Sequence, residues 1–369
     1  MKSAGRLSFF FCFLLLGHCL FARTPAEIAA SLDDSTLAAQ VLLTGVDGRG
    51  SLPQGMRALL ERIPAGGVML FRFNLNTPRA DVKNLLSEID EVINRSSGIP
   101  PFISVDHEGG LVHRFGPGVE RLPSAYSFWQ LAQAEGWDAA FARAETLYRR
   151  SAAEIRELGI NLVLAPVAET LDEENRVFLV TRSFGPDPDF TEAIASIYIR
   201  NMAAEGIAST VKHFPGNSAV DPHYDIAILH ADRAALDEMA RPFAGIIRNL
   251  GPSIIMMSHV VVYAWDSQLP ASLSRPIIQD WLRGELGFQG LVMADDFAMD
   301  AVAATGLSSA AATVKALNAG VDMIMVWPHE LTRVHAAILE ALRTGQLRRE
   351  RLVEAVERII EVKLRYGIM

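Results

Sequence analysis

Short apolar runs alternate along the chain with longer segments in which apolar residues recur every three or four positions. The short runs show no polar–apolar alternation, which is typical of strands buried on both faces of a parallel sheet. We predict strands at 67–70, 102–105, 161–164, 208–211, 253–257, 290–293 and 322–326. We predict helices at 26–45, 79–94, 139–158, 189–204, 232–249, 274–285, 310–319, 329–344 and 348–366. The segment 26–45 would cap the fold.

Polar clusters directly follow the predicted strands at 102–105, 208–211 and 290–293. In a closed barrel, the carboxyl ends of all strands converge on one mouth, so such clusters meet. An open doubly wound sheet would gather ligands at one switch point and leave the other groups along an edge. Neither a linker nor a break in composition divides the chain. We therefore predict an α/β fold, a single-domain (β/α)8-like TIM barrel.

The N-terminal segment has the composition of a secretory signal. Lys2 and Arg6 precede the apolar run 7–16, which is too short to span a membrane. We expect residues 1–22 to be a signal peptide and residues 23–369 to form the barrel domain. The protein would then be exported to the periplasm or the extracellular space, without a membrane span in the mature chain. An N-terminal anchor that is retained is the alternative.

Both cysteines of the chain, Cys12 and Cys19, lie in this expected signal. We therefore expect no disulfide and no cysteine-based nucleophile or metal site in the mature chain. The tetrapeptide ending at Cys19 loosely resembles a lipoprotein cleavage box, so a lipid anchor on Cys19 is a second alternative. The formal net charge of −9, without a basic run, argues against nucleic acid as a partner.

The loop after the predicted strand 208–211 concentrates the strongest candidate chemistry. Lys212, His213, Asp221 and His223 fall within twelve residues. Buried charges must be paired or functional, and a carboxylate that orients an imidazole makes a proton-transfer group near neutral pH. An Asp-x-His in a loop is also compatible with plain polar surface. The same arrangement of a strand followed by acids recurs elsewhere, which favours the functional interpretation.

Two further clusters repeat this arrangement. Asp295 and Asp296 follow one apolar run, and Asp106 follows another, with Arg114 a few residues on. Adjacent carboxylates repel each other unless a positive or hydrogen-bonding group lies between them. Arg182 supplies a further cation. From the residues alone, either Asp295 or Asp296 could be the reactive carboxylate.

Several other chemistries fit these residues poorly. The histidines are not spaced at i, i+4 on a predicted helix, and Lys212 with two arginines would repel a cation, so we expect neither a metal nor a cofactor. The chain has no Gly-x-Ser-x-Gly, no Gly-x-Gly-x-x-Gly and no Walker motif. What remains is a carboxylate nucleophile with an Asp-oriented His, beside groups that can bind a polyhydroxylated ligand. These parts suit glycosyl transfer through a covalent intermediate.

Several motifs, in this order, resemble glycoside hydrolase family 3. They are VDHEGG at 105–110 with Arg114-Phe115, RSFG at 182–185, KHFPG at 212–216, Asp221-x-His223, and LRGELGFQG at 282–290 leading into Asp295-Asp296. The single-domain length and the Asp-x-His resemble the NagZ-type β-N-acetylhexosaminidase branch. The resemblance implies a barrel that hydrolyses terminal β-linked N-acetylglucosamine with retention, typically from peptidoglycan fragments.

The resemblance also implies roles for individual residues. Asp295 would be the nucleophile, His223 the acid/base and Asp221 the residue that orients His223. The sugar would be bound by Asp106, Arg114, Arg182, Lys212 and His213.

The chain departs from the family pattern at two places. Asn217-Ser218 stand where the family usually has His-Gly-Asp, the loop to Asp221 is shorter by two residues, and Ala294 replaces a Ser. These changes bear on rate and substrate range more than on the fold. Two alternative functions stay open: a β-glucosidase of the same family, which would normally need a second domain, and a non-catalytic muropeptide- or sugar-binding protein on this scaffold.

Overall fold

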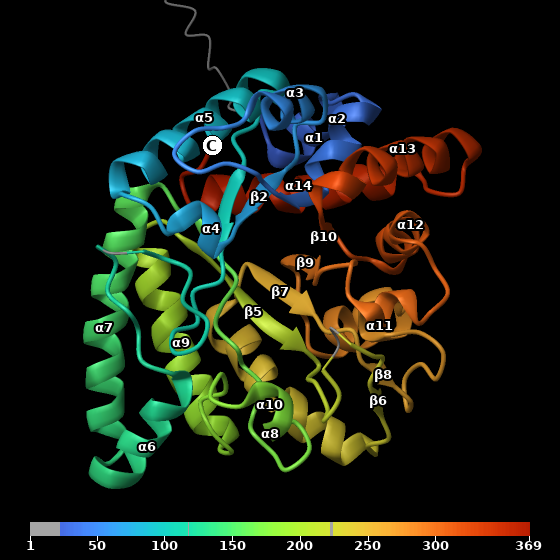
Figure 1. Ribbon diagram of the computed structural model, residues 1–369. Helices are drawn as coiled ribbons and strands as arrows, with labels where there is room; N and C mark the ends of the chain where they lie inside the picture. Colours follow the sequence, from blue (N-terminus) through green and yellow to red (C-terminus); the bar gives the residue numbers. More distant parts are fainter. Residues whose placement is uncertain (1–22, 117, 222–223) are drawn as a thin grey trace, which may run out of the picture.

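Eight parallel strands close into a barrel in the computed structural model, which describes residues 23–116, 118–221 and 224–369 (Figure 1). In order around the barrel, they are β1 (Leu42–Gly45), β10 (Met323–Val326), β9 (Leu291–Ala294), β7 (Ile254–Met257), β5 (Ala208–Phe214), β4 (Leu162–Val163), β3 (Phe102–Val105) and β2 (Gly67–Leu70). The predicted (β/α)8 barrel is confirmed. Every residue of these strands is buried, which explains why their sequences lack polar alternation.

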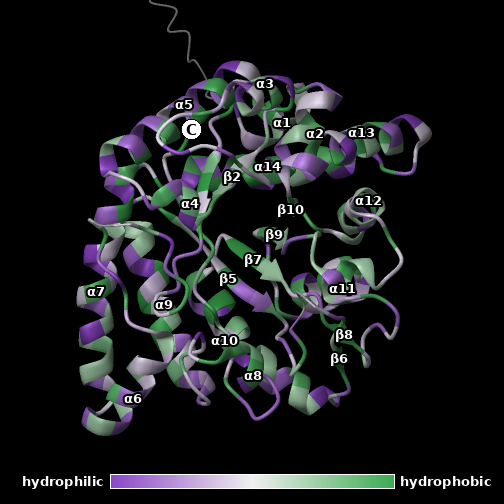
Figure 2. Cartoon of the chain, viewed as in Figure 1, coloured by the Kyte–Doolittle hydropathy of each residue, from purple (hydrophilic) through white to green (hydrophobic). Residues whose placement is uncertain are grey.

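Helices surround the barrel. They are α1 (Pro25–Ser31), α2 (Asp34–Gln40), α3 (Gln54–Arg62), α4 (Arg72–Leu75), α5 (Arg79–Ser97), α6 (Ala125–Glu135), α7 (Trp137–Leu158), α8 (Arg176–Leu179), α9 (Pro188–Ala204), α10 (Arg233–Leu250), α11 (Asp300–Ala303), α12 (Ser309–Ala319), α13 (Pro328–Thr344) and α14 (Arg349–Arg365), with a 3-10 turn η1 (Ala271–Leu273) and a π-helix η2 (Pro276–Glu285). Figure 2 shows the outer helices striped, with hydrophobic and hydrophilic residues alternating along them. Such stripes are expected where one helix face packs on a barrel and the other meets water. In the described part of the chain, no helix is both long and apolar enough to cross a membrane.

The predicted single helix at 26–45 is wrong. Asp33 interrupts it, because its side chain accepts a hydrogen bond from the Thr36 amide and starts a second helix, α2. The end of the segment is not helical but forms β1, between β10 and β2. The chain therefore enters the barrel at once. Helix α1 packs against α14, and α2 packs against α13 and α14, so the first two described helices lie beside the last two.

Strand β5 is longer than the predicted 208–211 and includes Lys212 and His213. Both residues are therefore held by the sheet and not by a loop. A small parallel pair outside the barrel, β6 (Ile228–Leu229) with β8 (Val261–Val262), was also not predicted.

One fully buried carboxylate ties three elements together where β10 begins. Asp322 accepts hydrogen bonds from Arg283 of η2 (2.8 Å) and from Arg351 and Arg358 of α14 (2.6 and 3.0 Å). It also accepts one from the Val292 amide of β9 at 2.9 Å. Burial and the neighbouring arginine charges lower the pKa of Arg283 to about 10, although Asp322 opposes this shift.

Candidate active site

A cavity of about 300 Å³ opens at the carboxyl ends of the barrel strands. Its apolar floor includes Met69, Met256 and Met325, which come from three different strands. Its polar lining is Asp106, Glu108, Arg114, Arg182, Lys212, His213, Asn217, Ser258, His259, Asp295 and Asp296. Six of the eight predicted site residues thus lie around one cavity: Asp106, Arg114, Arg182, Lys212, His213 and Asp295.

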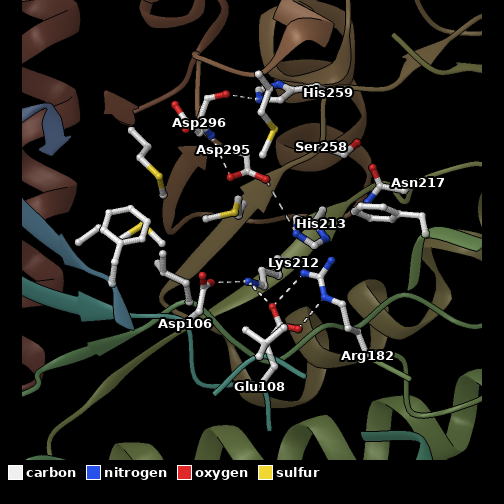
Figure 3. A pocket seen from close by; sticks show the side chains of 18 of the residues that line it. Asp106, Glu108, Arg182, Lys212, His213, Asn217, Ser258, His259, Asp295 and Asp296 are labelled. Atoms are coloured by element: carbon white, nitrogen blue, oxygen red, sulfur yellow. Dashed lines mark hydrogen bonds and ion pairs between the residues drawn. The ribbon is translucent and has the colours of Figure 1, made fainter. Parts of the chain in front are cut away.

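Lys212 and two acids form a buried ion-pair network on one side of the cavity (Figure 3). The Lys212 Nζ lies 3.0 Å from Asp106 Oδ1 and 2.7 Å from Glu108 Oε1. Burial by itself lowers the pKa of Lys212, but the two carboxylates more than offset it and raise this pKa above its ordinary value. Lys212 is therefore a permanent cation at this end of the cavity.

Two arginines complete this network. Arg114 donates to Asp106 Oδ2 at 2.9 Å, and Arg182 binds both oxygens of Glu108 at 2.7 and 2.9 Å. Burial raises the pKa of both acids, but Lys212 and Arg114 hold the pKa of Asp106 below its ordinary value, and Arg182 and Lys212 do the same for Glu108. Both acids are thus charged acceptors with fixed positions. Such a set of charged donors and acceptors suits the hydroxyl groups of a sugar.

His213 follows Lys212 on β5, and its ring lies between Glu169 and Asp295. Its Nδ1 lies 2.6 Å from Oε1 of Glu169, and its Nε2 lies 3.9 Å from Oδ2 of Asp295. Glu169 is almost completely buried and also accepts bonds from the amide of Asn217 at 2.6 Å and from its side chain at 3.0 and 3.1 Å. Glu169 therefore fixes the orientation of the His213 ring.

The two adjacent acids after β9 have different hydrogen-bond partners. Asp296 accepts from Trp327 Nε1 at 2.6 Å through Oδ2 and from the Ala298 amide at 2.8 Å through Oδ1. Asp295 accepts the Asp296 amide at 2.9 Å through Oδ1, which leaves its Oδ2 on the side of His213. Figure 3 shows Asp295 facing the Lys212 side across the cavity. The geometry favours Asp295 as the reactive carboxylate, which the residues alone could not decide.

His259 supports the turn that carries these acids. Its ring contacts Ser272 Oγ at 2.8 Å through Nδ1 and the Asp296 carbonyl at 3.2 Å through Nε2. A carbonyl only accepts, so Nε2 carries a proton and donates it. The imidazole thus fixes the backbone directly after Asp295.

Of the predicted acid/base pair, only Asp221 lies among the described residues. Asp221 lies in the loop after β5, where its carbonyl accepts from the amides of Tyr224 at 3.0 Å and Asp225 at 3.3 Å. His223 lies outside the described residues. The roles expected for these two residues therefore stay predictions.

Several residues of the site were not predicted, namely Glu108, Glu169, Asn217, His259 and Trp327. Glu108 stands in the same motif as Asp106. Its charge next to a buried strand could have indicated that it belongs to the site. Asn217 was recognised only as a departure from the family pattern. Glu169 precedes its partner His213 by 44 residues, and no local pattern joins them. Among the described residues, no group of three or more His, Cys, Asp or Glu side chains is placed to hold a metal ion.

The closed barrel and its carboxylate-lined mouth, together with the similarities that follow, define a glycoside hydrolase. Residues 39–362 match the family described as Glycosyl hydrolase family 3 N terminal domain, and the chain belongs to this family. The family resemblance noted in the sequence is thereby confirmed. The chain is 37% identical over 317 residues to a protein of Stenotrophomonas maltophilia named Beta-hexosaminidase, covering 83% of this chain and 90% of that protein.

Solved structures show the same architecture. A glycoside hydrolase family 3 beta-N-acetylglucosaminidase from Paenibacillus superposes with a TM-score of 0.84 at 29% identity, covering 92% of this chain and 63% of that chain. This chain thus spans less than two thirds of that relative. A Beta-N-acetylhexosaminidase from Beutenbergia cavernae has a TM-score of 0.80 at 26% identity, covering 90% of this chain and 99% of that chain.

Proposed function

We propose that this protein is a retaining β-N-acetylglucosaminidase that removes terminal β-linked N-acetylglucosamine. The observation that carries the proposal is the position of Asp295, which faces a fixed ionic network across a cavity of about 300 Å³. The names of the Stenotrophomonas and Beutenbergia relatives support the same substrate class.

The network would bind the sugar first. Asp106 and Glu108 would accept hydrogen bonds from hydroxyl groups, and Lys212 would donate to them. Because these side chains are buried and already paired, they reorganise little when the sugar enters. Binding there would place the anomeric carbon beside Asp295, whose Oδ2 would attack it and form a covalent glycosyl-enzyme intermediate.

A second group must protonate the departing oxygen and later activate water. We assign this role to His223, oriented by Asp221, on the short loop after β5. An imidazole suits both steps because its ordinary pKa lies close to neutrality. This assignment rests on the Asp-x-His motif, since His223 lies outside the described residues.

Export of the protein belongs to the same proposal. With residues 1–22 removed as a signal, the enzyme would act outside the cytoplasm on peptidoglycan fragments that end in N-acetylglucosamine. The intact mass of the protein from its native host tests this point. A mature chain that begins near Arg23 is expected, whereas a retained leader or acyl chains on Cys19 would replace soluble export with an anchor.

Parallel assays of 4-nitrophenyl β-glycosides of N-acetylglucosamine and of glucose test the activity. We expect a kcat/KM for the N-acetylglucosamine derivative that exceeds the glucose value by at least about a hundredfold, which corresponds to roughly 3 kcal/mol of transition-state binding. A preference for glucose would make the protein a β-glucosidase. Binding of the sugar without turnover would make it a non-catalytic sugar-binding protein.

A further inference from the structure

A strained turn leads from α8 into the active-site cavity. Within residues 23–116, 118–221 and 224–369, Val180 is the only residue other than glycine with a positive φ. Its φ of 51° and ψ of −104° lie close to about +60° and −120°, the values at the first central position of a type II′ turn. The Arg182 amide closes this turn by donating to the Leu179 carbonyl at 2.8 Å. Glycine suits such a position, whereas a β-branched side chain is strained there.

Contacts on both sides of Val180 hold it in this conformation. Before it, Leu179 is fully buried in a small apolar cluster with two residues that follow β4. After it, the Thr181 carbonyl accepts a hydrogen bond from the Tyr126 amide at 3.2 Å. The Val180 side chain is 48% exposed, so its own packing does little to offset the strain. Strained backbone of this kind persists only where the surrounding structure enforces it, and it is most frequent at functional sites.

The turn places Phe178 against the ionic network of the cavity. Phe178 belongs to α8, is half-buried and lines the cavity. The Cζ atom of Arg182 lies over its ring, 5.3 Å from the centroid, and the ring of His213 lies 6.3 Å away. The same guanidinium binds both oxygens of Glu108. A cation–π contact stabilises the charged side chain that it covers, so Phe178 helps to hold Arg182 in the position that fixes Glu108.

The segment that carries Phe178 is attached to the barrel by few contacts. Six of the nine residues from 172 to 180 are exposed, and only Asn175 and Leu179 are buried. A segment with so little buried surface can change conformation without unfolding the rest of the protein. A change of Val180 to a negative φ would release the strain, and it would also redirect Phe178, two residues earlier, away from Arg182.

We propose that Phe178 and Val180 are positioning residues that set the affinity of the cavity for its sugar. In the observed conformation, Phe178 covers Arg182 and the network is ready to bind. In a second conformation, Val180 has a negative φ, Phe178 is withdrawn and the network binds the sugar less tightly. Valine at this position raises the population of the second conformation, which lowers the apparent affinity and speeds release of the product sugar. This inference rests on the proposed function, because the sugar is the N-acetylglucosamine named there.

A double-mutant cycle on the full chain tests this proposal. Titration calorimetry measures the binding of N-acetylglucosamine to the parent, to Val180→Gly, to Phe178→Ala and to the double variant. Because glycine adopts a positive φ without steric cost, Val180→Gly should bind the sugar about fivefold more tightly. Phe178→Ala should weaken binding, and adding Val180→Gly to it should change the affinity little, since the contact that the turn supports is gone. In assays with an aryl N-acetylglucosaminide, Val180→Gly should lower KM by a similar factor without raising kcat.

Two further variants serve as controls. Val177→Gly is the matched control, since it makes the same substitution on α8 at a side chain that is 74% exposed and has no positive φ. It should not tighten binding. Val180→Ile keeps the branched side chain and should behave like the parent. Phe178→Leu, which keeps much of the apolar volume but lacks the aromatic face, repeats the cycle if the alanine variant does not fold.

The remaining outcomes count against the proposal. A higher Tm of Val180→Gly without tighter sugar binding would show that the strain affects stability alone. Equal effects of Val180→Gly with and without Phe178 would show that the turn does not act through this ring. If the parent binds N-acetylglucosamine and Val180→Gly binds it no better, this inference fails and the proposed function stands. If the parent does not bind the sugar at all, the proposed function fails and this inference with it.

Discussion

At the scale of single residues, two adjacent acids have different surroundings. Both Asp296 side-chain oxygens accept hydrogen bonds, from Trp327 and from Ala298, while Oδ2 of Asp295 remains on the cavity side near His213. A nucleophile needs one oxygen within reach of the anomeric carbon, and an oxygen held by strong donors is a weaker nucleophile. The hydrogen-bond pattern therefore distinguishes the two carboxylates, although they are neighbours in the sequence.

Asp295→Asn should reduce kcat for an N-acetylglucosaminide by about three powers of ten or more, because it removes the group that forms the covalent intermediate. Asp296→Asn should cost less, since it weakens only the support of the turn. Steady-state rates of both variants, together with labelling by a slow fluorinated substrate, check this prediction. Labelling of Asp296, or no covalent adduct at all, would contradict it.

At the scale of elements, the sequence predicts the barrel well. The strands 67–70 and 102–105 were predicted with their observed bounds, because runs buried on both faces have a distinct composition. The first strand was missed because its four residues continue the apolar pattern of the helix before it. Only tertiary pairing with β10 and β2 shows that Leu42–Gly45 is extended.

Tertiary contacts that the sequence does not reveal also limit the prediction of the site. Residues directly after strands could be predicted to converge, because barrel closure alone brings them together. Glu169 and Trp327 could not, since they act through partners that lie 44 and 31 positions away along the chain. Short sequence motifs therefore identify the charged groups at the mouth of the barrel, but they do not identify the residues that orient these groups.

The loop after β5 is expected to position the acid/base. If it delivers His223 to the glycosidic oxygen, His223→Ala should reduce turnover of natural disaccharides far more than that of activated aryl glycosides, whose departure needs little protonation. Asp221→Ala should show the same pattern more weakly. Rates of both variants on both substrate types, with and without azide, check it. Equal losses on both types without azide rescue would place the acid/base elsewhere.

At the scale of the whole molecule, Asp322 joins β9, β10, η2 and α14 through one carboxylate without exposed surface. Asp322→Asn would leave three arginines around a neutral group, and removing one partner of a buried ion pair costs about 3–5 kcal/mol. Urea unfolding should show a loss of this size. Glu340→Gln, which removes an exposed acid paired with Arg343, is the matched control and should change stability little. Similar small effects of both substitutions would contradict the structural role of Asp322.

Lys363 gives the molecule a second global property, a stability that depends on pH. This lysine of α14 is completely buried, with its Nζ 3.1 Å from Gln40 Oε1 and 5.0 Å from the centre of the Phe102 ring. Burial lowers its pKa from 10.5 to about 7, and the charge of Asp90 offsets this only in part. Above about pH 7, the folded protein therefore holds Lys363 mainly as the neutral amine.

The sign of the effect follows from the two pKa values. Above pH 10.5 the amine is neutral in both states, and below about pH 7 both states carry the proton, so the full cost of burying the charge is present there. Between these values only the unfolded chain binds the proton, and the free energy of unfolding should rise with pH by on the order of a few kcal/mol. Lys363→Met should remove this rise. Urea unfolding of both proteins at several pH values from 7 to 10 checks it, because all other titrating groups are common to the two chains. Parallel pH profiles of the two proteins would show that Lys363 is charged in the folded state and that its burial carries no such cost.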